Sequence, residues 1–127
     1  MFENLDVFRM SSAMARHAGQ RQALISQNVA NADTPGFKGS EMPPFASLYA
    51  SADTAGVQRA TRAQHLNGAI QGTGMASREM RGGDSPNGNG ISLETELLKS
   101  AEVKSHHDRA LTIYKSALDV LRATIGK

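Results

Sequence analysis

The uneven placement of proline and glycine is the feature that most restricts what this 127-residue chain can fold into. All four Pro and ten of the twelve Gly fall between residues 33 and 90. Proline removes a backbone donor and glycine has a large conformational entropy to lose, so both disfavour helices. Long helices are therefore expected only near the two ends. We divide the chain into an N-terminal helical segment (1–33), a middle segment (34–90) and a C-terminal helical segment (91–127).

Residues 4–32 are predicted to form one helix, because they lack Pro and contain a single Gly. Large apolar side chains recur along one side of this helix, and small residues lie between them. Small residues let another helix approach closely but bury little area, so the helix alone would be marginal in water. The packing positions that we assign to it are Leu5, Phe8, Ile25 and Val29.

The C-terminal segment carries a longer pattern, with alternating spacings of four and three residues that are typical of a coiled-coil seam. The centre of this seam is polar, with Ser100, Lys104 and His107. The pattern fits both one helix of an ordinary bundle and a coiled coil between molecules. The lean hydrophobic content of 39% favours partners that complete the core. The apolar members of the seam are Leu93, Leu97, Leu111, Tyr114, Leu118, Leu121 and Ile125.

The two helices match in length, at about 44 and 51 Å for a rise of about 1.5 Å per residue. The simplest fold is mainly α, with the long N- and C-terminal helices paired as an antiparallel coiled-coil hairpin. The Gly/Pro-rich insertion between them is predicted to contain β structure. Alternation at residues 57–62 indicates one strand, and glycines on both sides of residues 75–81 indicate a second.

Residues 28–38 are predicted to end the first helix and to direct the chain away from it. Thr34 precedes a proline, which disfavours a helical backbone at that residue. Pro35 and Gly36 then suit the centre of a type II turn, with Gly36 at the position of positive φ. Turn chemistry alone is compatible with a simple helix stop. The residues that we assign to this joint between helix and insertion are Asn28, Ala30, Asn31, Thr34, Pro35, Gly36, Phe37 and Lys38.

Composition excludes several classes of protein. There is no Cys, so disulfides and thiolate metal sites are impossible. The net charge is only +2 and no basic cluster stands out, which argues against nucleic-acid binding. No apolar run is long enough for a membrane span, and no cleavable signal peptide is recognised. His106 and Glu102 are spaced for one ion, but two ligands do not make a zinc site. We predict no catalytic residue, no metal site and no cofactor.

The motif at residues 28–38 resembles the signature of the flagellar axial proteins, which include the rod, hook and hook-adaptor proteins. Residues 1–5, 64–66 and 87–96 resemble further segments of the basal-body rod proteins in that family, and the short length is similar to that of a proximal rod member. The run from Gly39 to Pro44 departs from the family pattern, because it is richer in proline. The resemblance is strong over residues 1–38 and 87–127 and weak between them.

This resemblance implies a structural, non-enzymatic subunit of the proximal rod, a tubular drive shaft that transmits torque and encloses the export channel. The implied partners are other copies of the chain, other rod proteins, the rod adaptor FliE, the export gate and the membrane-ring complex. The implied location is the flagellar basal body, reached by type III export without a cleaved signal peptide. The alternative is a small helical adaptor or regulatory protein, which would show a basic face or a compact helix-turn-helix.

Overall fold

The computed structural model describes residues 2–52, 77–80 and 89–126, with side chains described from residue 6 to 49 in the first range. Its elements are helix α1 (Phe2–Ala30), strand β1 (Ser40–Glu41), helix α2 (Phe45–Ala52), strand β2 (Arg78–Glu79) and helix α3 (Leu93–Ile125). The chain forms two compact units, one made of residues 1–41 and 79–127 and the other of residues 42–78. The first unit contains the long helices and the joint.

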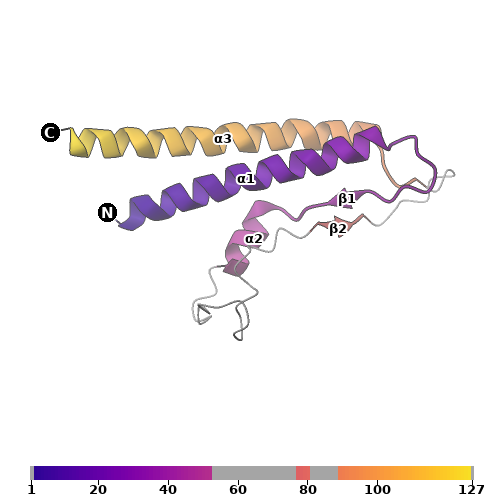
Figure 1. Cartoon of the computed structure of the whole chain (residues 1–127), viewed down its shortest axis with the longest axis horizontal. Helices are drawn as coiled ribbons and strands as arrows, with labels where there is room; N and C mark the ends of the chain where they lie inside the picture. The colour runs from indigo at the N-terminus through magenta and orange to yellow at the C-terminus, as the bar shows by residue number, and fades with distance from the viewer. Residues whose placement is uncertain (1, 53–76, 81–88, 127) are drawn as a thin grey trace. The chain divides into compact units, whose positions relative to one another are not determined.

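Helices α1 and α3 lie side by side in opposite directions, with the start of α1 and the end of α3 at the same end of the pair (Figure 1). The contacts confirm this direction, because partners fall along α3 as positions rise along α1. Phe8 meets Tyr114, with ring centroids 5.1 Å apart. Further along, the Gln22 amide donates to the Ser100 hydroxyl over 3.0 Å. The predicted fold, a mainly helical chain with paired terminal helices, is therefore confirmed.

The core between the helices is small. Ala18, Ile25 and Val103 are buried together, and Val29 packs against them. Along α3 the buried residues are Glu96, Val103 and Ala110, which recur every seven positions. That interval brings one line of side chains back to the same side of a helix, as in a coiled coil. Two of the buried residues between the helices are alanines, Ala18 on α1 and Ala110 on α3, so little apolar area is buried per turn.

The insertion differs from the prediction in one element. We expected no helix between residues 34 and 90, yet α2 occupies Phe45–Ala52. Two prolines precede it, and proline suits the start of a helix because the first donors of a helix have no partner within it. The Ser47 amide donates to the Pro44 carbonyl over 3.1 Å. The eight-residue sequence between turn residues was too short to give a clear helical period.

The β structure of the insertion is a two-stranded sheet of β1 and β2. Strand β2 falls within the range predicted for the second strand, residues 75–81. Its partner β1 was not predicted, and the strand expected at residues 57–62 lies outside the described residues. No helix in the described part of the chain is both long and apolar enough to span a membrane.

Candidate functional site

The motif at residues 28–38 ends α1 and turns the chain as predicted. Gly36 has a φ of 72°, which confirms the left-handed position expected for it. The Phe37 amide donates to the Thr34 carbonyl over 3.2 Å and closes the turn. The Thr34 amide in turn donates to the Asn31 carbonyl over 3.0 Å. Two consecutive hydrogen-bonded turns therefore carry the backbone from the end of α1 to β1.

Asn89 caps the end of α1 from the far side of the insertion. Its side-chain amide donates to the Ala32 carbonyl and, over 3.4 Å, to the Asn31 carbonyl. Its oxygen accepts the Ile91 amide over 3.2 Å. Asn31 and Ala32 lie in the turn just beyond α1, and the Asn31 carbonyl also accepts the Thr34 amide, so Asn89 ties this turn to the residues that precede α3. Asn89 thus brings the start of α3 to the end of α1.

Asn28, the first residue of the motif, is 2% exposed and contacts both β1 and α3. Its side-chain oxygen accepts the Ser40 amide over 3.0 Å, and its nitrogen donates to the Ser40 carbonyl over 2.9 Å. One side chain thus pairs with both backbone groups of Ser40, as a neighbouring strand would. The same nitrogen donates over 3.0 Å to Oε2 of Glu96, on α3. Asn28 therefore joins three elements.

Glu96 is a buried carboxylate, with an exposed fraction of 1%. Its second oxygen, Oε1, accepts from the Lys99 ammonium over 2.6 Å. A buried charge is costly unless it is both paired and hydrogen-bonded, and both conditions are met here. A second ion pair, Arg21 with Glu102 at 3.5 Å, spans α1 and α3 nearer the surface.

The strand that leaves the joint is held by close packing. The Met80 amide donates to the Gly39 carbonyl over 2.7 Å. Gly39 is buried, and a Cβ placed there would meet the Met80 sulfur at 2.9 Å and the Ile91 side chain at 3.0 Å. Nearby, the Lys38 ammonium lies 2.8 Å from a Glu79 carboxylate oxygen. That hydrogen bond and the negative charge raise the pKa of Lys38 above its ordinary value.

The other motif residues lie at the surface of the joint. Asn31 is half-buried, and its side-chain nitrogen donates to the Gln27 carbonyl over 2.8 Å. Phe37 is half-buried, and Ala30, Thr34, Pro35, Gly36 and Lys38 are exposed. The motif thus contains one buried residue, Asn28, and a surrounding turn.

The seam positions assigned from the sequence fall into two groups. Ile25 is buried, and Phe8, Val29, Leu118 and Leu121 are half-buried. The side chain of Leu5 lies outside the described residues. The remaining positions form what we call the outer leucine face of α3, and all of them are exposed: Leu93, Leu97, Leu111, Tyr114 and Ile125.

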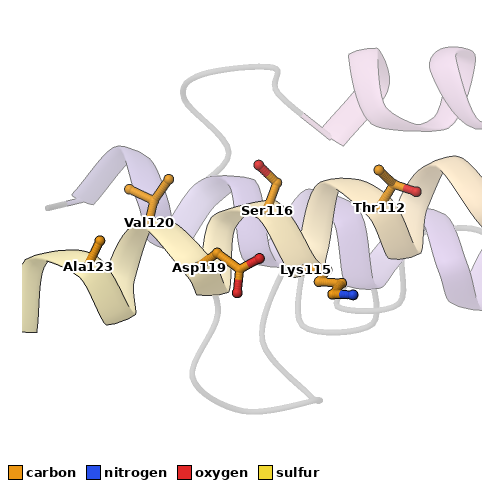
Figure 2. Close-up of a pocket in the computed structure, with 6 residues that line it drawn as sticks. All are labelled: Thr112, Lys115, Ser116, Asp119, Val120 and Ala123. Atoms are coloured by element: carbon orange, nitrogen blue, oxygen red, sulfur yellow. The ribbon is translucent and has the colours of Figure 1, made fainter. Parts of the chain in front are cut away.

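The described residues offer no evident centre for chemistry. No three of their His, Asp or Glu side chains lie close enough to share a metal ion. A surface depression on α3 is lined by side chains of that helix, all of them exposed (Figure 2). Ligand sites usually enclose a ligand and present polar groups from several directions. We assign no ligand to this depression, whose lining residues are Thr112, Lys115, Ser116, Asp119, Val120 and Ala123.

Sequence reasoning missed the partners of the motif. The resemblance at residues 87–96 includes Asn89 and Glu96, but no contact was assigned to either residue. For Glu96 a signal did exist, because it stands seven residues before Val103 and fourteen before Ala110, on the buried line of α3. An acidic residue on a line of core positions indicates a buried polar contact. No comparable signal pointed to Ser40.

Gly36→Val is expected to destabilise the joint by about 1–3 kcal/mol, the usual cost of a strained backbone. No atom lies within 4 Å of a Cβ placed there, so the effect would come from the φ of 72° and not from a clash. Pro35→Ala should cost less than about 1 kcal/mol, since it mainly frees the unfolded chain. Gly36→Asn serves as the control, because asparagine tolerates positive φ. Chemical denaturation measures all three, and equal stabilities for the Val and Asn variants would contradict the role of φ.

Two comparisons with known proteins agree with this arrangement. A family model described as flagella basal body rod protein matches residues 10–38, which cover most of α1 and the whole joint. The flagellar basal body rod protein FlgB of Agrobacterium fabrum is 28% identical over 128 residues, covering 97% of this chain and 95% of that protein. The match to FlgB therefore extends over both long helices. The chain is therefore similar to the flagellar basal body rod proteins, and to FlgB along nearly its whole length.

Proposed function

We propose that this chain is a rod protein and a subunit of the proximal rod, where it assembles with its own copies and other rod proteins into a tubular drive shaft. The shaft would transmit torque and enclose the export channel. A rod protein is a structural component and not an enzyme. The observation that carries the proposal is the outer leucine face of α3, whose leucines remain exposed beside α1, although its Tyr114 ring contacts Phe8 of α1.

The outer leucine face lies beside the line of α3 that contacts α1. Leu97 and Leu111 directly follow the buried residues Glu96 and Ala110, and a step of one residue turns a helix by about 100°. Both leucines are about half exposed, at 57% and 49%. Exposed large apolar side chains thus occur toward both ends of α3, with the polar residues Ser100, Lys104 and His107 between them. Large exposed apolar patches mark interaction sites, and patches spread along one helix suit another long helix as their partner.

The proposal also assigns roles to the three segments. Residues 1–33 and 91–127 would form the helical core of the rod, and residues 34–90 an arm that reaches its neighbours. The motif residues would set the angle at which the arm leaves the core. The further partners proposed are FliE, the export gate and the membrane-ring complex, with export that needs no cleaved signal peptide. A helical adaptor or regulator is the second candidate, and no contact in the described structure favours it.

Leu111→Asp tests the proposed function. In the free chain the new carboxylate would remain largely in water, so helix content should change little. In an assembly the same carboxylate would be buried without a partner, which costs several kcal/mol. We expect normal helix content by circular dichroism, and loss of both rod incorporation and motility in a strain that carries the variant.

Ser116→Asp is the matched control, because it adds a carboxylate at an exposed polar position of the same helix. It should keep most of the motility. Wild-type motility of the Leu111→Asp strain would show that the outer leucine face is not an assembly surface. A regulatory protein would instead leave rod assembly intact in both strains.

A further inference from the structure

The apolar contacts between α1 and α3 do not by themselves fix the position of one helix along the other. The buried line of α3 repeats every seven residues, and its apolar members are only Val103 and Ala110. A slide of α3 by seven residues, about 10.5 Å, returns the same side of the helix to α1. The long insertion between the helices would permit such a slide at little cost, because closure entropy changes slowly with loop length.

The polar contact between Asn28 and Glu96 exists at one level of the pair. A slide of seven residues would place Val103 where Glu96 now lies. Asn28 would then keep a buried N–H without an acceptor, and Glu96 would lose one of its two donors and keep only the Lys99 ammonium. Each unpaired buried group costs about 1–3 kcal/mol, and a charged one costs more. The pair thus penalises this slide of seven residues relative to the observed alignment.

Asn28 also binds β1, at the base of the insertion, and so couples the position of this strand to the alignment of the helices. Its amide has two N–H groups and one oxygen, and these groups serve Ser40 and Glu96 together. A third and weaker contact runs from its nitrogen to the Met80 sulfur at 3.6 Å. The side-chain orientation that binds Glu96 is therefore the one that presents a strand-like edge to Ser40.

We propose that Asn28 and Glu96 form a register lock, which selects one alignment of α1 and α3 and fixes β1 to that alignment. A single buried asparagine can set the register of a coiled coil in the same way, at some expense of stability. Here the lock links the base of the insertion to the helices. β1 would take its observed place only when the helices are correctly aligned.

The test replaces Glu96 by leucine, which extends the apolar line of α3. The chain contains no Cys, so introduced thiols are the only ones present. Gln22→Cys with Ser100→Cys reports the observed alignment, because these side chains are hydrogen-bonded at 3.0 Å. Gln22→Cys with His107→Cys reports a slide of seven residues. A short bifunctional methanethiosulfonate captures either pair in the full chain.

We expect Glu96→Leu to keep its helix content and to raise the shifted cross-link at least about tenfold over the parent chain. Hydrogen exchange of the Ser40 amide, taken relative to that of Ala110, should accelerate by a similar factor. Glu96→Gln keeps an acceptor for Asn28 and should retain the native pattern. Glu102→Leu is the control, since it removes a carboxylate that pairs with Arg21 and does not contact Asn28.

Two outcomes would overturn the register lock. The first is a Glu96→Leu chain with only the native cross-link and an unchanged Ser40 exchange ratio. The second is a collapse of helix content in that variant, which would make Glu96 a stability residue and not an alignment residue. A shifted cross-link of equal size in Glu102→Leu would also contradict the proposal, because the effect would then follow from lost charge.

Discussion

Val103→Asp is expected to abolish the pairing of α1 with α3. Val103 is 2% exposed and packs with Ala18 and Ile25, the other buried members of the small core. An unpaired carboxylate at that position costs several kcal/mol unless it takes up a proton. Domains of this size are stable by only about 5–15 kcal/mol in total. Because the helices have few other apolar contacts, this one change should remove most of the stability of the pair.

Circular dichroism and chemical denaturation of the purified chain measure the effect. Ser105→Asp is the matched control, because it places a carboxylate two residues away at an exposed position of the same helix. The contrast with Leu111→Asp is informative as well, since that variant should fold and fail only in assembly. Retained cooperative unfolding in Val103→Asp would mean that the helices are held together elsewhere.

The two long helices were predictable because their signals are local and repeated. Absence of proline, apolar periodicity and matching length each pointed to the same pair. The side of α3 that meets α1 was harder to predict from the sequence. From the spacing we assigned the seam to the line through Leu93, Leu97 and Leu111, whereas the buried residues of α3 are Glu96, Val103 and Ala110. The structure places Val103 and Ala110 against α1 and leaves Leu97 and Leu111 exposed.

The turn at Gly36 was predictable for a similar reason, since proline and glycine act on their own backbone. The hydrogen bonds of Asn28 and Asn89 were not. They join residues 12, 57 and 68 positions apart, and an amide side chain has no sequence pattern that identifies such a partner. Contacts of that range depend on the fold as a whole. The joint was thus recognisable as a turn, while the polar network that anchors it was not.

Gly39→Val is expected to detach β1 from the joint. The position is buried, and even a single Cβ would lie 2.9 Å from the Met80 sulfur and 3.0 Å from Cγ1 of Ile91. The methionine can move, but the branched isoleucine has fewer alternatives. Overpacking of this kind typically costs about 1–3 kcal/mol, and the two further methyl groups of valine act in the same direction. We expect lower stability and weaker rod incorporation.

A companion change distinguishes this clash from a general intolerance of the joint. Met80→Ala removes the atom nearest to the new Cβ, so Gly39→Ala combined with Met80→Ala should be less destabilised than the two single effects predict together. Gly19→Ala is the control for losing a glycine, because no atom lies within 4 Å of a Cβ there. Because residue 19 lies inside α1, Gly19→Ala should raise the free energy of unfolding by about 0.5–1 kcal/mol. Additive effects in the double variant, measured by chemical denaturation, would contradict the contact between Gly39 and Met80 as the cause.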